Sequence, residues 1–375
     1  MREYLTVFLV AAVVTYLLGV VAREVALRTG AVARVRDRDV HAVPIPYFGG
    51  VAMLGGLVAA YLVAQRLPFL SLSDEVVFHD SRVVLVGGAM ICLLGVLDDL
   101  FELDALTKLG GQVLAAGFLV VNQVQYSSFQ LPGGIQFSLV GAQAALLSVF
   151  VVVSTVNAVN FVDGLDGLAA GVVGIGAVAF FAFAYNLADA NNETLAISAA
   201  LLCAALGGAC AGFLPHNFFP ARIFMGDSGS MLIGLVLSGS ALTLTGQFAA
   251  VDMSQGVGGS QASLLPTLLP IVLPISILIV PFADLVLAVI RRTRAGRSPF
   301  SPDKQHLHHR LLEIGHSHRR AVLIMWLWAG LIAFGGVLAS LYASRFTLVL
   351  LGAWVVLTVA LTFTVPRLQR PAARG

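Results

Sequence analysis

The sequence predicts an all-α membrane protein that crosses the bilayer about eleven times. Of its 375 residues 58% are hydrophobic and only 11% are charged, and the mean hydropathy is +0.91. A soluble protein of this length carries roughly 25% charged residues. Because a bilayer offers no partner to free backbone groups, helices are expected, and no apolar–polar alternation indicates a membrane barrel. The composition therefore excludes a soluble enzyme, a disordered chain and a nucleic-acid-binding protein.

Eleven apolar segments account for the predicted spans, since the hydrocarbon core requires about 20 apolar residues per helix. They cover residues 4–22, 47–65, 82–97, 108–124, 139–158, 168–186, 194–213, 228–246, 264–290, 321–341 and 346–363. The first is interpreted as a helix rather than a signal peptide, because it is long and no cleavage site follows it. The ninth contains Pro266, Pro270, Pro274 and Pro281, so we expect it to be bent or broken.

The positive residues predict the orientation of these spans. Of 22 Lys and Arg residues, all lie in one set of alternate loops or the C-terminal tail except Arg2, Arg66, Arg82 and Arg345. The positive-inside rule makes the richer side cytoplasmic, which places the N-terminus outside and the C-terminus inside. We expect a single membrane domain over residues 1–375. Its cytoplasmic loops are predicted at about residues 23–46, 97–110, 157–170, 214–230 and 291–320.

Four polar clusters fall in these cytoplasmic loops. They are Asp98-Asp99, NAVNFVDGLDGLAAG at residues 157–171, FMGDSGS at residues 224–230, and the long loop at residues 291–312. Polar groups close to hydrocarbon are costly and usually functional. The clusters are distant in the sequence, so folding must bring them together if they form one site.

The carboxylates of these clusters suggest a site for a divalent cation. The five acids are Asp98, Asp99, Asp163, Asp166 and Asp227. Mg²⁺ prefers oxygen ligands, typically one or two carboxylates together with substrate phosphates. The alternative is that these acids cap helices and form turns, because Asp-Gly is a turn dipeptide and Asp before Ser is typical of a helix start. Five acids on one face favour the functional interpretation.

Amide and cationic side chains add the means to bind a nucleotide sugar. Asn157, Asn160 and Asp163 are spaced by three and share one side if the helix continues, and Asn amides can bind a pyrimidine edge or a sugar hydroxyl. Phe224 is a candidate for stacking on a base, although a core or lipid-facing position is the alternative. The final loop carries a run of donors that suits a phosphorylated sugar, with a solvated loop or a transition-metal site as alternatives. The run consists of His306, His308, His309 and Arg310.

With these motifs the chain resembles the polyprenyl-phosphate N-acetylhexosamine-1-phosphate transferases of glycosyltransferase family 4. It is most similar to the bacterial branch that loads GlcNAc-1-phosphate onto undecaprenyl or decaprenyl phosphate. The matching segments, spread over about residues 37–320, are HAVPIPYFGG, Asp98-Asp99 with Lys108, NAVNFVDGLDGLAAG, FMGDSGSMLIG and HLHHRLLEIGHSHRR. Leu307 interrupts the histidine run, which is continuous in the related phospho-MurNAc-pentapeptide transferase. His41, Ala42 and Val43 stand where that enzyme has lysines, so no lysine role is transferred to that loop.

The resemblance implies a role for each matching residue. Asp227, with Asp98 and Asp99, would hold Mg²⁺, for which Mn²⁺ is an alternative, and Lys108 would bind the lipid phosphate. The implied nucleotide-binding residues are Asn160, Asp163, Gly164, Leu165, Asp166 and Phe224. The implied sugar- and phosphate-binding residues are His306, His308, His309 and Arg310. The catalytic candidates are Asp98, Asp99, Asp163, Asp166, His308 and His309.

The implied reaction is the Mg²⁺-dependent transfer of GlcNAc-1-phosphate from UDP-GlcNAc to a polyprenyl phosphate. It would release UMP and initiate a lipid-linked cell-envelope glycan at the cytoplasmic face of the bacterial inner membrane. Asp98 would act as a base, an orienting group or a covalent nucleophile. We favour direct attack by the lipid, because a phosphate monoester has its second pKa near ~6 and is already largely dianionic. The expected partners are the two substrates and membrane lipid, with a homodimer left open and no nucleic acid.

Two alternatives to this reaction are consistent with a polytopic membrane protein. One is the same chemistry with another UDP-N-acetylhexosamine or with UDP-MurNAc-pentapeptide. The other is a polytopic transporter of a metal or an anion. Transporter sites tend to lie near the bilayer midplane on broken helices of related repeats. In this sequence the acids and histidines lie at one face and no repeat is detected, which favours the transferase.

Overall fold

The computed structural model describes residues 1–32, 44–126, 128–131, 135–191, 194–245, 293, 311, 315–342 and 344–363. In this part of the chain, eight helices are long and apolar enough to cross a membrane. They are α1 (Arg2–Thr29), α3 (Glu75–Phe101), α5 (Ala142–Val162), α6 (Leu168–Asn191), α7 (Thr194–Asn217), α8 (Gly226–Thr245), α11 (His318–Leu341) and α12 (Arg345–Phe363). Two further apolar helices are shorter, namely α2 (Gly49–Ala64) and α4 (Ala105–Val121).

These ten helices correspond one by one to ten of the eleven predicted apolar segments, which confirms a polytopic helical membrane protein. The predicted ninth segment, 264–290, and the bend expected in it lie outside the described residues. The count of eleven and the orientation in the membrane therefore stay predictions.

Two small elements were not predicted from the sequence. A two-stranded antiparallel hairpin joins β1 (Ser128–Leu131) to β2 (Ile135–Ser138), with Ser128 opposite Ser138. A short 3₁₀-helix, η1 (Leu70–Leu72), lies between α2 and α3. Strands of four residues are too short to give a hydropathy signal, so the prediction of an all-α chain omitted them. They lie in the connections between helices and leave the helical architecture unchanged.

Polar caps explain why several helices extend beyond the apolar segments that predicted them. The Asp74 carboxylate accepts a hydrogen bond from the Val76 N–H at 3.4 Å and begins α3. Asp104 begins α4 by accepting bonds from the N–H groups of Leu106 and Thr107 at 2.9 and 3.0 Å. Such carboxylates satisfy backbone donors that the first turn of a helix leaves unpaired. At the opposite end of the same helix, Asp98 and Asp99 lie in the last turn of α3.

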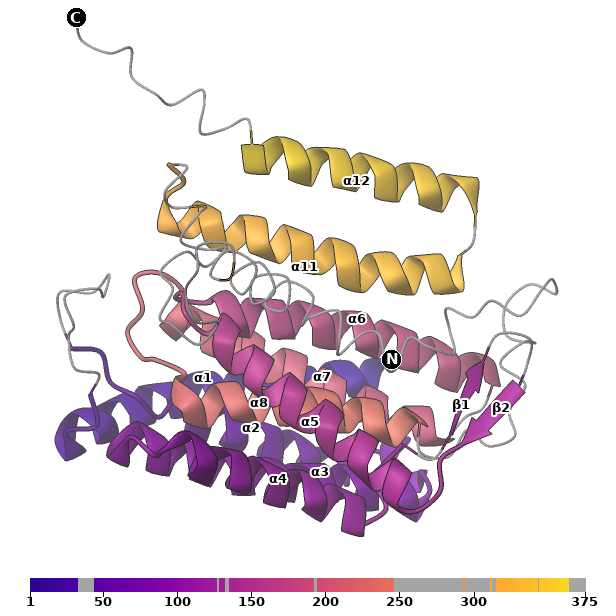
Figure 1. Ribbon diagram of the computed structural model, residues 1–375, viewed down its shortest axis with the longest axis horizontal. Coiled ribbons are helices and arrows are strands. Elements are labelled where there is room, and N and C mark those ends of the chain that lie inside the picture. The colour runs from indigo at the N-terminus through magenta and orange to yellow at the C-terminus, as the bar shows by residue number, and fades with distance from the viewer. Residues whose placement is uncertain are drawn as a thin grey trace, which may run out of the picture.

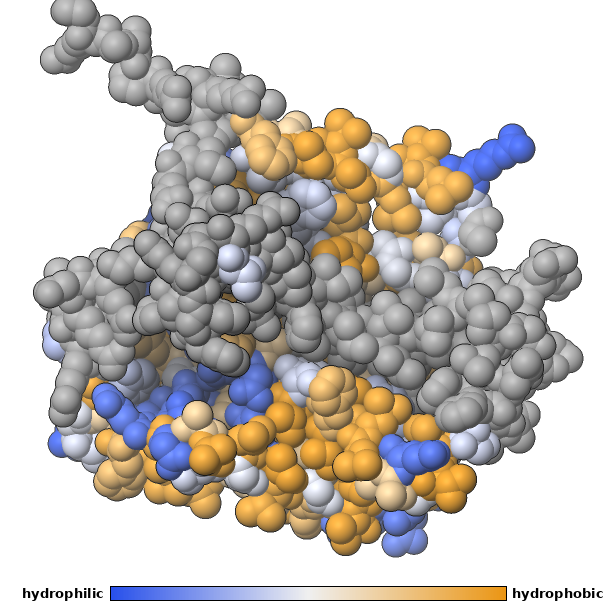
Figure 2. Space-filling model, in the orientation of Figure 1, coloured by the Kyte–Doolittle hydropathy of each residue, from blue (hydrophilic) through white to orange (hydrophobic). Residues whose placement is uncertain are grey.

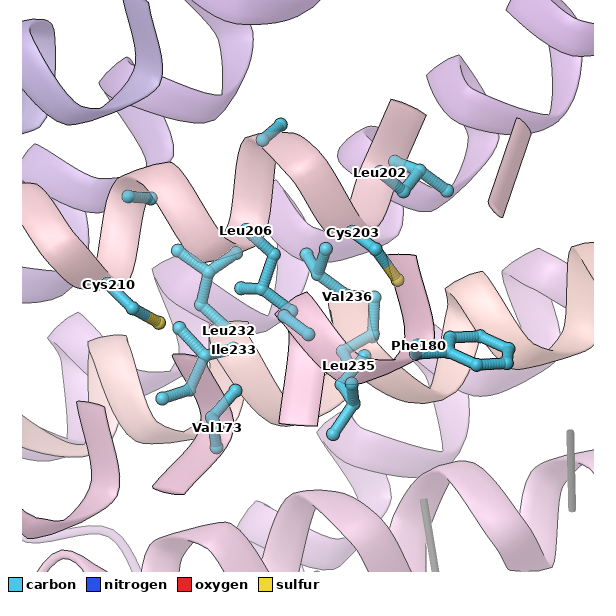
Figure 3. Packing of buried hydrophobic residues seen from close by; sticks show 14 of the residues in the cluster. Val173, Phe180, Leu202, Cys203, Leu206, Cys210, Leu232, Ile233, Leu235 and Val236 are labelled. Atoms are coloured by element: carbon cyan, nitrogen blue, oxygen red, sulfur yellow. The ribbon is translucent and has the colours of Figure 1, made fainter. Parts of the chain in front are cut away.

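The core of the bundle is built around α7 and α8. Helix α7 packs against α1 and α6, and α8 packs against α3 and α5. Figure 3 shows apolar side chains of α7 and α8 meeting those of α6; they include Leu206, Cys203, Leu232, Ile233, Val236, Val173 and Phe180. In Figure 1, α11 and α12 lie beyond α6, with α12 at the outer edge next to α11. Of the described spans, α8 is the most buried, and it carries Asp227 in its first turn.

Two glycines allow neighbouring helices to approach the first turn of α8 closely. A Cβ atom on Gly50 of α2 would lie 2.3 Å from the backbone nitrogen of Gly229. A Cβ atom on Gly95 of α3 would lie 2.3 Å from the Cα atom of Ser228. These distances are far shorter than any van der Waals contact, so α2 and α3 can take these positions only with glycine there.

One end of the bundle carries the polar connections. Figure 1 shows the chain before α2 and the chain before α8 at the same end. In Figure 2 hydrophilic side chains gather toward that end, while apolar side chains cover much of the remaining described surface in this view. Large exposed apolar residues such as Leu93, Leu114 and Phe150 point outward from α3, α4 and α5. This surface suits hydrocarbon, and the polar end suits the membrane–water boundary.

Candidate active site

The centre of the site is the first turn of α8, which is capped by a side chain from α3. The Asp99 carboxylate, in the last turn of α3, accepts hydrogen bonds from the N–H of Asp227 at 2.9 Å and of Ser228 at 3.3 Å. Gly226 has φ 70°, and a Cβ atom there would lie 2.4 Å from an Asp99 carboxylate oxygen. The glycine therefore permits both the turn and the close approach of Asp99. Asp99 caps α8 and thereby fixes the backbone of Asp227.

Lys108 of α4 lies between two carboxylates. Its ammonium donates to Asp227 at 2.9 Å and forms an ion pair with Asp98. The side chains of Lys108 and Asp227 are 31% and 28% exposed, whereas that of Asp98 is 7% exposed. Asp98 also accepts a bond from the Leu103 N–H at 2.8 Å. Asp98 thus holds the ammonium from the inner side, while Lys108 and Asp227 remain accessible to a ligand.

Asn160, in the last turn of α5, orients the other oxygen of Asp227. Its amide nitrogen donates to Asp227 Oδ1 at 3.0 Å and to the Ser230 hydroxyl at 3.0 Å. Lys108 contacts Asp227 Oδ2, so each carboxylate oxygen has its own donor. Asp227 is therefore held in a defined orientation by residues of α4 and α5.

Asp163 directly follows α5 and adds a further carboxyl group. Burial, together with the negative charges of Asp227, Asp99 and Asp166, raises the pKa of Asp163 well above its usual range. Burial is the largest of these causes, so the Asp163 carboxyl holds its proton more readily than a free aspartate does. The negative charges of the neighbouring carboxylates add to this effect.

The Asp-Gly turns after α5 are joined to the segment before α8. Asp166 accepts a hydrogen bond from the Ala221 N–H at 2.9 Å. The Gly167 N–H donates to the Asn217 side chain at 2.9 Å, and Asn217 in turn donates to the Ile223 carbonyl at 3.1 Å. These bonds fix the two predicted nucleotide-binding segments relative to each other.

Phe224 lies where that segment reaches α2. Its N–H donates to the Pro46 carbonyl at 2.8 Å, and its carbonyl accepts from the Gly49 N–H at 3.1 Å. Its ring is partly buried and lies 6.3 Å from the ring of Tyr47. Leu165 is buried in the core, whereas Gly164 is exposed. Of the predicted nucleotide-binding residues, Asn160 and Asp163 are therefore the ones placed beside Asp227 and its neighbouring carboxylates, and the binding roles of all six stay predictions.

The structure tests the predicted grouping only in part. It brings together Asp98, Asp99, Lys108, Asn160, Asp163 and Asp227 from α3, α4, α5 and α8. The run of His306, His308, His309 and Arg310 lies outside the described residues. Three further residues at or near the site, Ser230, Asn217 and Gln112, were not predicted from the sequence. Ser230, three residues after Asp227, could have been found from helical spacing, whereas Asn217 gives no such signal.

The donor set fits Mg²⁺. Among the described residues, no three acidic, histidine or cysteine side chains converge as a closed metal site. Mg²⁺ rarely uses such a site in enzymes that act on phosphates, because it takes its remaining ligands from water and substrate. Asp98, Asp99, Asp163 and Asp227 offer oxygen ligands, and Lys108 is the cation that contacts two of them. This set of oxygen ligands therefore fits a divalent cation.

Comparison with known proteins assigns the family. The model of "Glycosyl transferase family 4" matches residues 81–245, a range that contains every residue of the cluster. The chain is 48% identical over 374 residues to decaprenyl-phosphate N-acetylglucosaminephosphotransferase of Mycobacterium tuberculosis, covering 99% of this chain and 90% of the relative. The protein of the same name from Mycolicibacterium smegmatis is 45% identical over 373 residues, with the same coverage.

A more distant relative extends the match beyond the mycobacteria. A probable undecaprenyl-phosphate N-acetylglucosaminyl 1-phosphate transferase of Bacillus subtilis is 31% identical over 356 residues, covering 94% of this chain and 90% of the relative. The alignment covers nearly the whole chain, so the similarity is not confined to the acidic motifs. The chain is therefore an enzyme of glycosyl transferase family 4 and belongs to its polyprenyl-phosphate N-acetylhexosamine-1-phosphate transferases.

Proposed function

We propose that this enzyme transfers GlcNAc-1-phosphate from UDP-GlcNAc to a polyprenyl phosphate in a Mg²⁺-dependent reaction. The observation that carries the proposal is the cluster in which Lys108 lies between Asp98 and Asp227 at the first turn of α8. It presents an ammonium for one phosphate and carboxylates for a metal ion that binds others. The cluster lies toward the polar end of an apolar bundle, where a membrane lipid and a soluble nucleotide can meet.

The proposed chemistry is a single displacement at phosphorus. An oxygen of the lipid phosphate attacks the phosphorus that bears the sugar. The bond from this phosphorus to the bridging oxygen breaks, and UMP leaves with the electron pair. The products are polyprenyl-diphosphate-GlcNAc and UMP. When bound, Mg²⁺ would neutralise charge on the pyrophosphate and on the leaving UMP.

The residues of the cluster have separate roles in this proposal. Lys108 binds the acceptor phosphate, and Asp98 holds the Lys108 ammonium and accepts any proton that remains on that phosphate. Asp227 is the principal metal ligand, and Asp98 and Asp99 are further candidates. Asp99 has the additional task of capping α8.

Donor recognition is assigned to two residues of the cluster and to residues near it in the sequence. Asn160 and Asp163 contact the uridine and pyrophosphate side, together with Gly164, Leu165, Asp166 and Phe224. We assign the run of His306, His308, His309 and Arg310 to recognition of the sugar side of the donor. We place the site at the cytoplasmic face of a bacterial plasma membrane, where the product would begin an envelope glycan.

The relatives favour decaprenyl phosphate as the first acceptor to test. The two mycobacterial relatives, at 48% and 45% identity, are named for decaprenyl phosphate, and the Bacillus relative, at 31%, for undecaprenyl phosphate. All three names specify N-acetylglucosamine. This agreement favours UDP-GlcNAc over UDP-MurNAc-pentapeptide as the donor.

The test is a donor panel with the purified full-length protein in detergent. Decaprenyl phosphate and Mg²⁺ are combined in turn with UDP-GlcNAc, UDP-GalNAc and UDP-MurNAc-pentapeptide, and released UMP is measured. We expect UMP only with UDP-GlcNAc, and only when both lipid and metal are present. Absence of UMP, or faster release from UDP-MurNAc-pentapeptide, would contradict the proposal.

A further inference from the structure

A buried amide pair joins α4 to α5 beneath the acidic cluster. Gln112 is 3% exposed, and its carbonyl oxygen accepts a hydrogen bond from the Asn157 amide nitrogen at 2.6 Å. In the reverse direction the Gln112 amide nitrogen lies 3.4 Å from the Asn157 carbonyl oxygen. The pair is fixed further by a bond from Asn157 to the Val153 carbonyl at 2.8 Å and by contact of Gln112 with the Met231 sulfur at 3.5 Å.

The spacing of this pair connects it to the site. Gln112 lies four residues after Lys108 on α4, and Asn157 lies three residues before Asn160 on α5. Residues three or four apart share one face of a helix. Lys108 and Asn160 are the residues that contact the two oxygens of Asp227. The amide pair therefore joins the same two helices one turn below the two donors to Asp227, and Met231 links it to α8.

We propose that Gln112 is a positioning residue, which through Asn157 sets the distance between Lys108 and Asn160 and so the orientation of Asp227. The inference rests on the proposed function, because it assigns Gln112 a role in that reaction. Displacements of about 1 Å in a reacting group can cost up to ~10²-fold in rate. Hydrogen bonds between membrane helices, in contrast, add little to stability. The two effects can therefore be separated by experiment.

Three variants of the full-length enzyme separate positioning from packing. Gln112→Leu removes both hydrogen bonds and leaves a side chain of similar size. The double variant Gln112→Asn with Asn157→Gln exchanges the two amides and preserves their combined length. Thr155→Val is the control, because Thr155 is buried on α5 and, among the described residues, its hydroxyl bonds only to the Val151 carbonyl of its own helix.

In Gln112→Leu, Lys108 and Asn160 should no longer be held at the correct distance from each other, and the expected kinetics follow from this change. Gln112→Leu should lower kcat about 10-fold and leave the KM for each substrate within about 2-fold. The exchanged pair should recover kcat to within about 3-fold of wild type. The control should behave as wild type, and the thermal unfolding midpoint should be the same in all four proteins.

A second readout does not depend on turnover. The chain contains two lysines, Lys108 and Lys304, so labelling with an amine-directed acylating reagent can be followed by mass spectrometry with Lys304 as the reference. Lys108 should react several-fold faster in Gln112→Leu than in wild type, because its contact with Asp227 is loosened, and the exchanged pair should restore slow labelling.

Three results would overturn the inference. They are wild-type kcat in Gln112→Leu, unchanged labelling of Lys108 in that variant, and a loss of kcat that the exchanged pair does not recover. A wild-type protein that releases no UMP would instead refute the proposed function, which makes the two failures distinguishable.

Discussion

Asp227 owes its orientation to residues of three other helices. Asp99 of α3 binds its backbone, Lys108 of α4 contacts one carboxylate oxygen, and Asn160 of α5 contacts the other. Charge-assisted hydrogen bonds of this kind are stronger than neutral ones and keep a carboxylate ionised and fixed. The Asp227 carboxylate is therefore held in one orientation while its side chain stays partly exposed.

The first prediction concerns the charge of Asp227. Asp227→Asn keeps the shape of the side chain but removes the negative charge that Mg²⁺ and Lys108 require. We expect a folded protein whose kcat is lower by at least about 100-fold. The control is Asp189→Asn, at an exposed position near the C-terminal end of α6. Near-normal turnover of Asp227→Asn at limiting Mg²⁺ would show that another residue is the principal ligand.

Asp98 and Asp99 show how far the sequence could predict single residues. The pair was correctly expected at the end of an apolar helix beside the other acids. Its division of labour could not be predicted, because one member contacts Lys108 and the other caps a helix that begins 127 residues after Asp99 in the chain, at Gly226. The sequence is compatible with either a functional or a helix-capping role for each acid. The structure shows that Asp99 caps a helix.

At the scale of elements, α8 begins inside the protein and depends on Asp99 for its cap. Asp99 accepts one bond through each carboxylate oxygen, whereas Asn has a single acceptor oxygen and Ala has none. Asp99→Ala should therefore lower the apparent free energy of unfolding in detergent by about 1–2 kcal/mol, and Asp99→Asn by roughly half as much. Denaturant titration of the two variants measures the difference. Equal losses would show that the cap contributes nothing.

The contact between α2 and α8 gives a second prediction at this scale. Gly50→Ala places a methyl group against the Gly229 backbone, and overpacking of this kind typically costs 1–3 kcal/mol. Gly110→Ala on α4 is the matched control, because no atom of the described part of the chain lies within 4 Å of its added Cβ atom. Replacing Gly by Ala within a helix should stabilise it by about 0.5–1 kcal/mol. The thermal unfolding midpoint should therefore fall in the first variant and not in the second; a fall in both would contradict the packing.

Hydropathy located the helices but not their contacts. Ten described helices lie where apolar segments predicted them, because burial in lipid imposes a length and a composition on each span. The bonds of Asn217 to Gly167 and Ile223, and the pairing of Gln112 with Asn157, depend on which helices become neighbours. The spacing of residues in a single sequence does not show which helices pack against each other. The two short strands were missed for a different reason, their length.

At the scale of the whole molecule, the orientation prediction follows from the uneven distribution of Lys and Arg. Ser71, in the connection between α2 and α3, should lie outside, and Ser317, just before α11, should lie in the cytoplasm; both are exposed. The native cysteines Cys92, Cys203 and Cys210 are buried and should react slowly. In intact cells a membrane-impermeant maleimide should label Ser71→Cys but not Ser317→Cys. Labelling of both would refute the predicted number of spans between them, and labelling of Ser317→Cys alone would reverse the orientation.

The central claim is that the reaction breaks the bond between the sugar-bearing phosphorus of the donor and the oxygen that bridges its two phosphates. UDP-GlcNAc carrying ³²P only in the sugar-bearing phosphate distinguishes this from ordinary glycosyl transfer. The enzyme is incubated with this donor, decaprenyl phosphate and Mg²⁺, and the lipid and aqueous fractions are separated. The account predicts that the label enters the lipid in proportion to the UMP released, and that Asp227→Asn abolishes both. Label that remains in the aqueous fraction as UDP while the lipid gains GlcNAc would contradict it.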